Sequence, residues 1–208
     1  MSQEKLFDLY EKVYFSEIEN KDKLHTRVQT IFSLIVIEVT VLTYLAKNTS
    51  LENVPCLSII VILLTIGSFF MVIYSCFRLQ KAFWGNAFRY LPTPNDINTY
   101  RLELIEYEKT FIDYCNKNKI KYENEHNPDN KIQEYIAKEL MECTSWNIKK
   151  NEDRSSEIFE STKIFFCSLV PLLIAVIIFL SADLDSASPR KTAEPNYVII
   201  PVENMRSL

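Results

Sequence analysis

Apolar residues along the chain are concentrated in three long runs. Residues 57–77 and 164–182 contain no charged side chain, and residues 31–46 contain only one, Glu38. Because about 20 apolar residues cross the hydrocarbon core of a bilayer as a helix, we predict about three transmembrane helices. Because runs of this length and apolar character are best assigned to lipid, the sequence excludes a soluble globular domain.

The polar segments between the runs show helical periodicity. A first amphipathic stripe leads into residues 31–46 with neither proline nor glycine before Pro55, and another helix is expected to begin near Asp96. From Lys131 a last helix is expected to continue unbroken into residues 164–182, and residues 78–88 are expected to prolong the second span. The stripe of the last helix reads Ile132, Ile136, Leu140, Cys143, Asn147, Asn151, Arg154 and Ile158.

The distribution of Lys and Arg predicts the orientation. The segment before the first span and the segment between the second and third spans are rich in positive charge, whereas the short loop after Ala46 carries only Lys47. The positive-inside rule then places the N-terminus in the cytoplasm, in a multi-pass protein of the inner (cell) membrane.

We therefore predict an all-α integral membrane protein with three transmembrane helices and a helical cytoplasmic stalk. Its expected segments are a cytoplasmic amphipathic helix (1–28), a two-span hairpin (29–77), a cytoplasmic helical region (78–163), a third transmembrane helix (164–182) and a disordered tail (183–208).

Composition argues against most kinds of enzyme and against a cofactor or metal site. The chain has only two glycines, so the clustered glycines of nucleotide-binding loops are absent. Two histidines 101 positions apart and five scattered cysteines give no zinc-site spacing. The net charge of -4 indicates no nucleic-acid partner. We expect a non-enzymatic protein without cofactor.

Three polar residues interrupt the apolar stripe of the last helix and form the first candidate site. Asn147, Asn151 and Arg154 must be hydrogen-bonded if they are buried. They could hold a phosphate or nucleotide, or they could bind backbone carbonyls near residues 91–95 or face solvent. Trp84 and Arg89, at the end of the second span, are further ligand-sensing or gating candidates, with an interfacial aromatic belt as the alternative for the tryptophan.

Polar residues inside the spans form the second candidate set. Glu38 is expected to face other helices or water, since a carboxyl in mid-bilayer costs roughly 2.5–3.5 kcal/mol on insertion scales. At about 100° per residue it lies opposite Thr40, so it serves either a pore or helix packing. The second span carries small hydroxyl residues in one sector, for helix contact or pore lining: Ser58, Thr65, Ser68 and Ser75.

The layout, with the run Trp146-Asn147-x-x-x-Asn151-x-x-Arg154-Ser155 before the last apolar stretch, resembles small bacterial membrane effectors of anti-phage defence. These are the two-span effectors associated with nucleotide-signalling systems and the retron membrane effectors; the third span departs from the two-span members. The resemblance implies an oligomeric pore or membrane-disrupting protein that stays inactive until a cytoplasmic signal arrives.

The expected function is therefore an oligomeric, membrane-permeabilising defence effector triggered by a cytoplasmic ligand or partner. Its expected partners are the lipid bilayer, further copies of the chain, and a nucleotide second messenger or a soluble protein. Two alternatives stay open: a membrane anchor or scaffold that recruits a soluble protein, and a regulated ion channel without a defence role. Glu38 favours permeation, because an anchor needs no intramembrane carboxyl.

Overall fold

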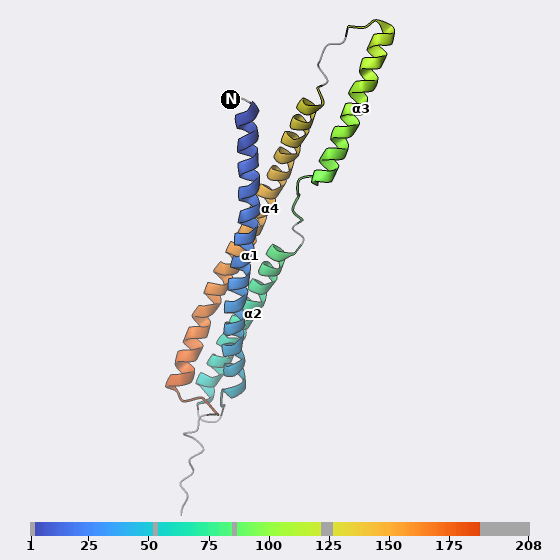
Figure 1. Ribbon diagram of the computed structural model, residues 1–208. Coiled ribbons are helices and arrows are strands. Elements are labelled where there is room, and N and C mark those ends of the chain that lie inside the picture. Colours follow the sequence, from blue (N-terminus) through green and yellow to red (C-terminus); the bar gives the residue numbers. More distant parts are fainter. Residues whose placement is uncertain (1–2, 52–53, 85–86, 122–126, 188–208) are drawn as a thin grey trace, which may run out of the picture. The chain divides into compact units, whose positions relative to one another are not determined.

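The computed structural model describes residues 3–51, 54–84, 87–121 and 127–187. Within these residues the chain is all-helical apart from turns and one isolated β-bridge between Thr49 and Asp185, which confirms the predicted fold class at the level of secondary structure. The helices are α1 (Gln3–Asn48), α2 (Pro55–Phe83), α3 (Pro94–Asn118) and α4 (Pro128–Ser181) (Figure 1).

Two of the sequence predictions about helix continuity are confirmed and the third is confirmed in part. α1 passes without a break from the polar N-terminal stripe into the first apolar run, and α4 does the same into the last one. α2 continues past residue 77 to Phe83, as expected, but residues 87 and 88 are not helical. There the backbone of residues 87–91 bonds to side chains of α1 and α4 in place of intrahelical partners.

α3 begins and ends where local chemistry requires. Thr93 is its N-cap and forms a capping box with Asp96, while Pro94 occupies the first turn, where no intrahelical N–H is needed. Lys119 ends the helix in the left-handed region, with φ 56°, and its N–H turns back to the carbonyls of the last turn. The helix start expected near Asp96 therefore lies at Pro94.

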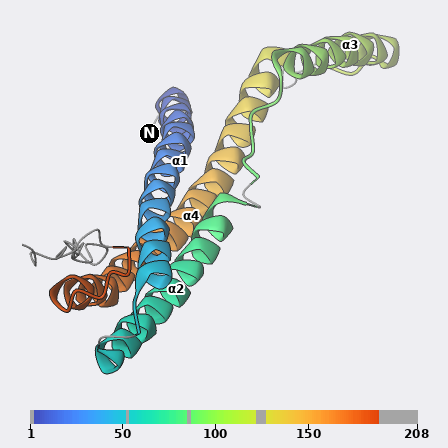
Figure 2. The same cartoon turned by 90° about the horizontal axis from the view of Figure 1, so that it is seen from below.

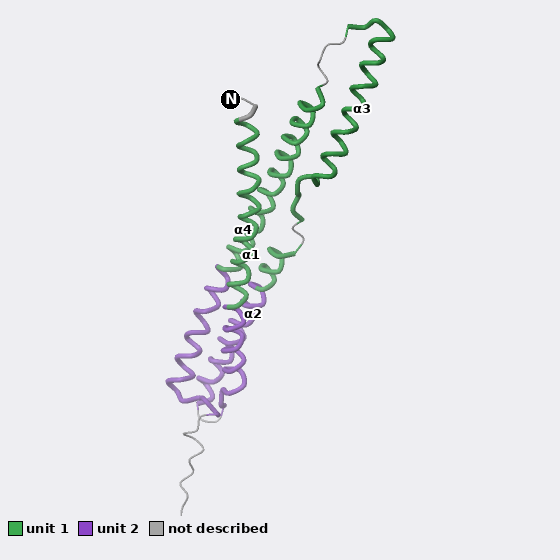
Figure 3. The backbone as a smooth tube through the Cα atoms, viewed as in Figure 1, with its two compact units in different colours: residues 1–33, 76–162 green, residues 34–75, 163–208 purple. Residues whose placement is uncertain are grey.

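The chain divides into two compact units (Figure 3). Unit 1 comprises Met1–Ser33 and Cys76–Thr162, and unit 2 comprises Leu34–Ser75 and Lys163–Leu208. α1, α2 and α4 contribute to both units, whereas α3 belongs to unit 1 alone.

Unit 2 is a bundle of three helical segments with a heptad core. Its buried positions follow alternating steps of three and four residues on every helix, the pattern that keeps one seam facing its partners. These positions are Ile35, Glu38, Leu42 and Leu45 on α1, Ser58, Val61, Thr65, Ser68, Val72 and Ser75 on α2, and Phe165, Ser168, Leu172, Ala175 and Phe179 on α4.

The outward side of unit 2 is as apolar as its core. Leu63, Phe70, Ile177 and Leu180 are each more than 60% exposed. A helix that is apolar on all sides suits lipid rather than water. In keeping with this, α1, α2 and α4 are long and apolar enough to cross a membrane. The finding is compatible with the predicted multi-pass arrangement.

Hydrogen bonds join the start of the α1–α2 loop to the segment after α4 at one end of unit 2. The N–H of Ser50 donates to the carbonyl of Leu184 at 2.9 Å, and the N–H of Ser186 donates to that of Asn48 at 3.0 Å. The hydroxyl of Tyr44 donates to Asp185 at 2.8 Å. The segment after α4 therefore lies beside the α1–α2 loop, on the same end of the bundle. The rest of the expected disordered tail lies outside the described residues.

Unit 1 joins two helical pairings. α1 packs on α4 through Tyr14, Leu140 and Cys143. α3 runs beside the first part of α4, away from α1 (Figures 1 and 2), and the rings of Tyr100 and Tyr135 meet there in a tilted arrangement with 4.9 Å between centroids. On this helix Cys115 is buried.

Topology can be tested by labelling with an impermeant thiol reagent in intact cells. Native Cys56 is exposed, whereas Cys115 and Cys143 are buried and would stay unlabelled on either side of the membrane. A fair inside reporter is therefore Ser145→Cys in a Cys56→Ser background, because Ser145 is exposed on α4. We expect labelling of Cys56 in intact cells and of the Ser145→Cys protein only after permeabilisation. Labelling of the latter in intact cells contradicts the orientation.

Candidate functional site

The polar residues of α4 lie in unit 1, where α2 ends and the chain becomes non-helical. We call residues 87–91 the strap. A helix leaves its last four carbonyls without intrahelical partners, and the residues after it lose helical bonds altogether. Buried backbone groups without partners are costly, so side chains must replace the missing bonds. In this protein those side chains come from α4 and α1.

Asn147 pairs with the strap through both backbone polar groups of Arg89. The N–H of Arg89 donates to the Asn147 side-chain oxygen at 2.9 Å, and the Asn147 amide nitrogen donates to the Arg89 carbonyl at 2.9 Å. Asn147 is fully buried. Its donor and acceptor therefore replace two backbone hydrogen bonds at once, which an apolar residue cannot do.

Three further side chains bind the strap on either side of this pair. The indole N–H of Trp146 donates to the carbonyl of Ala87 at 2.9 Å, and the thiol of Cys143 lies 3.5 Å from that of Tyr90. From α1, the hydroxyl of Tyr14 accepts from the N–H of Leu91 at 3.3 Å. The strap thus runs antiparallel to α4, with partners on two helices.

Arg154 holds the end of α2. Its Nε donates to the carbonyl of Ala82 at 3.1 Å, within the last turn of the helix. A cation at a helix C-terminus also interacts favourably with the helix dipole. Arg154 is 5% exposed, and this burial lowers its pKa from the ordinary value, while the nearby Asp22 opposes the change.

Asn151 links α4 to α1. Its amide nitrogen donates to the backbone carbonyl of Glu17 at 2.9 Å and to the Glu17 carboxylate at 2.7 Å. This contact gives the carboxylate of Glu17 a hydrogen-bond donor on α4. The three polar residues of the α4 stripe therefore all contact backbone groups, at Ala82, Arg89 and Glu17 rather than at residues 91–95.

The cations near the strap stack on aromatic rings. The Arg89 guanidinium lies 4.4 Å from the centre of the Trp146 ring, and the Lys150 ammonium lies 5.2 Å from it. Lys21 lies 5.2 Å from the Phe88 ring and donates to the Tyr90 hydroxyl at 2.8 Å. Such contacts contribute about 0.5–1 kcal/mol each at exposed sites. Neither Trp146 nor Lys21 was predicted as a site residue, since only the fold brings them to the strap.

Trp84 belongs to a neighbouring hollow and is 67% exposed. The hollow, of about 440 Å³, is lined by Lys81, Trp84, Asp153, Arg154, Ser156 and Glu157. Glu157 is paired with Lys81 at 2.8 Å and with Arg78 at 3.1 Å. The hollow therefore contains both signs of charge beside an exposed aromatic ring, and it gives a phosphate no uniformly positive surface.

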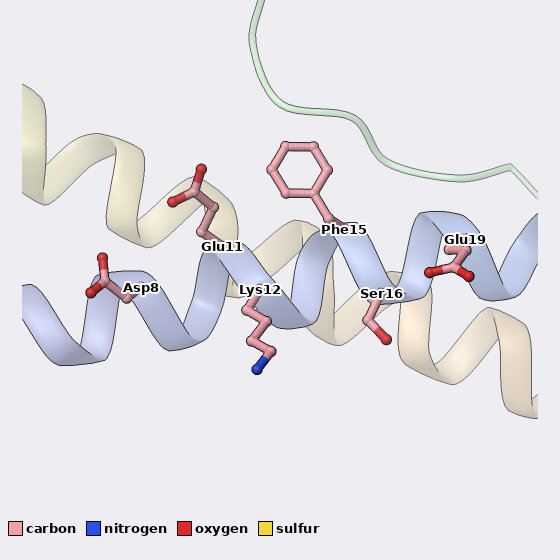
Figure 4. Close-up of a pocket in the computed structure, with 6 residues that line it drawn as sticks. All are labelled: Asp8, Glu11, Lys12, Phe15, Ser16 and Glu19. Carbon is pink, nitrogen blue, oxygen red and sulfur yellow. The ribbon is translucent and has the colours of Figure 1, made fainter.

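A second hollow lies along α1 and has no opposing wall among its lining residues. Figure 4 shows six side chains that spread from this single helix: Asp8, Glu11, Lys12, Phe15, Ser16 and Glu19. Because a ligand site needs groups that converge from several directions, this surface is not a candidate.

The second candidate set gathers in the core of unit 2. Glu38 is 3% exposed, and its Oε1 lies 2.7 Å from the Ser168 hydroxyl and 3.2 Å from that of Ser68. Ser58, Thr65 and Ser75 lie with Ser68 on the same buried face of α2. All four hydroxyl residues are thus buried within the chain's own bundle, and Thr40 is exposed on the opposite side of α1.

The described residues contain no cluster of His, Cys, Asp and Glu suited to a metal ion. Comparisons of the chain with protein-family models, curated proteins and solved structures find no match.

Loss of the Asn147 amide should loosen the strap. Asn147→Leu keeps the side-chain size but leaves the N–H and carbonyl of Arg89 without partners, at about 1–3 kcal/mol for each buried group. We expect hydrogen exchange of residues 87–91 to become at least about tenfold faster, because about 1.4 kcal/mol corresponds to tenfold. Ser145→Ala is the matched control, since this exposed hydroxyl bonds only to its own helix. Unchanged exchange in Asn147→Leu contradicts the role of the pair.

Proposed function

We propose that the protein is an oligomeric, membrane-permeabilising effector of bacterial anti-phage defence, triggered by a cytoplasmic ligand or partner that acts on unit 1. One observation carries the permeation part: the bundle of unit 2 buries a carboxyl, Glu38, among hydroxyls from two other helices. An ionisable residue within membrane helices is expensive and marks an ion or proton pathway by default. A helix bundle that serves only as an anchor gains nothing from it.

Unit 1 supplies a means of control. α2 has residues in both units, and its cytoplasmic end is held by Arg154 and followed by the strap. A ligand or partner that moves the strap therefore acts on the same helix that carries Ser68 into the core of unit 2. We propose that the signal reaches the membrane along α2, and that further copies of the chain complete the permeable assembly.

The scaffold alternative has its own supporting observation. α3 has four exposed side chains with large apolar surfaces: Leu102 57%, Ile105 41%, Tyr107 59% and Tyr114 57%. At about 100° per residue they fall on two sides of the helix, Leu102 with Ile105 and Tyr107 with Tyr114, and each pair offers apolar area to a partner. A soluble partner bound on α3 fits either a scaffold or a trigger for permeation. A measurement of membrane depolarisation distinguishes the two functions, because a scaffold does not depolarise the membrane.

Glu38→Gln tests the permeation role. Gln fills the same space and keeps hydrogen bonding but carries no charge. When the protein is overproduced in a bacterial host, we expect wild type to depolarise the inner membrane and Glu38→Gln to do so clearly less, with equal insertion and equal oligomer size. Thr40→Val is the control, because Thr40 is exposed and bonds only to its own helix. Full depolarisation by Glu38→Gln refutes the pore role of the carboxyl, and a wild type that never depolarises favours the scaffold.

Arg154→Ala tests the control along α2. The substitution removes the hydrogen bond from Arg154 to the Ala82 carbonyl at the end of the helix, so a signal at unit 1 no longer moves α2. We expect depolarisation and protection against phage to be lost while the inserted amount stays the same. Lys149→Ala, which removes an exposed cation nearby on α4, is expected to keep both. If Arg154→Ala instead disappears from the membrane, the residue is needed for folding and not for coupling.

A further inference from the structure

The surroundings of Glu38 contain more acceptors than hydrogens. The Ser68 hydroxyl lies 2.8 Å from the carbonyl of Ser168 and 3.2 Å from Glu38 Oε1. The Ser168 hydroxyl lies 2.7 Å from Glu38 Oε1 and 2.7 Å from the carbonyl of Phe165. Each hydroxyl has one hydrogen, so an ionised Glu38 leaves two hydrogens for these four contacts.

A proton on Glu38 resolves this arrangement. With the proton on Oε1, the carboxyl donates to the Ser168 hydroxyl, Ser168 donates to the Phe165 carbonyl, and Ser68 donates to the Ser168 carbonyl. The three hydrogens then occupy the three short contacts, and only the 3.2 Å contact has none. Distances of 2.7–2.8 Å are those of ordinary O–H···O bonds.

The second carboxyl oxygen points to the same protonation state. Glu38 Oε2 is buried and has no hydrogen-bond partner among the described residues. A carboxylate oxygen that carries half a negative charge cannot be left so without a large cost, whereas the carbonyl oxygen of a neutral acid can be.

Among the described residues of unit 2, no cation lies against Glu38 to compensate an ionised carboxyl. Between Pro55 and Ser75 on α2, and between Lys163 and Ser181 on α4, the ionisable side chains are Cys56, Tyr74, Lys163 and Cys167, and all four are exposed. On α1 within this unit, Tyr44 and Lys47 are exposed as well. The groups that contact Glu38 are therefore hydroxyls and not cations.

Pro171 lies one turn after Ser168 within α4. Proline has no N–H, so the carbonyl of Cys167, four residues earlier, receives no intrahelical hydrogen bond from it. Beside this position, the carbonyl of Ser168 accepts from the Ser68 hydroxyl of α2 at 2.8 Å, which closes the hydrogen-bond chain across all three helices.

We propose that Glu38, Ser68 and Ser168 form a proton-binding site inside the membrane unit, occupied in the arrangement described. When the proton leaves Oε1 for water, the carboxylate loses its donor role to Ser168 and requires hydration, so the three-helix core opens to water. The consequence that permeation increases with pH rests on the proposed function, whereas the proton site itself does not.

The test of the site uses infrared spectroscopy on the full chain in lipid vesicles. At neutral pH we expect the C=O stretch of a protonated carboxyl in wild type and its loss in Glu38→Gln. The other carboxyl groups are the same in both proteins, so the difference between the two spectra reports Glu38 alone. Ser168→Ala, which removes the acceptor of the carboxyl proton, should shift the band, and Thr40→Val should not. A wild-type spectrum with only carboxylate bands at neutral pH overturns the proposal.

The test of the consequence measures ion leakage from the same vesicles as pH is raised. We expect leakage through wild type to increase as the carboxyl band declines, and leakage through Glu38→Gln to stay low and independent of pH, since Gln imitates the neutral acid. An equal pH dependence in both proteins overturns the link between the proton and opening. A protonated band without leakage at any pH supports the proton site and overturns the proposed function.

Discussion

A polar group that the long helices bury is costly unless another group of the protein forms a hydrogen bond with it. This constraint organises both units. In unit 2 it brings Ser68 of α2 and Ser168 of α4 to the carboxyl of Glu38 on α1. The polar groups occupy heptad positions that would otherwise hold Leu or Val, and a polar group at such a position fixes register at a cost in stability.

In unit 1 the same constraint acts on the backbone. α2 stops at Phe83, so the chain that follows needs partners for its N–H and carbonyl groups. The side chains of Trp146 and Asn147 supply them from α4, Tyr14 supplies one from α1, and Arg154 binds the last turn of α2 itself. The ligand-binding candidates Asn147, Asn151 and Arg154 thus contact the chain's own backbone. A ligand that competes for them would release the strap.

The two arrangements share helices. α1 and α4 are each a single helix whose buried positions contribute to both units, and α2 ends in unit 1 after passing through unit 2. This continuity is the structural basis of the proposed control of permeation.

The sequence by itself determined the helices and the boundaries of the apolar runs. The uninterrupted α1 follows from the absence of proline and glycine within it, whereas α4 continues through Pro171. The stripe of α4 from Leu140 to Ile158 is buried as its periodicity predicted. Local propensity and periodicity suffice for this, because each depends only on neighbours within a few turns.

Tertiary structure alone decided where α2 ends and what each buried polar residue contacts. The pairing of Asn147 with Arg89, of Asn151 with Glu17 and of Glu38 with Ser168 joins residues 58, 134 and 130 positions apart. The sequence shows that each of these groups needs a partner, but hydrogen-bond chemistry is equally satisfied by a ligand, a second copy or the chain itself. In unit 2 the packing of three heptad seams selects the partner, and in unit 1 the course of the strap along α4 and the packing of α1 on α4 do so.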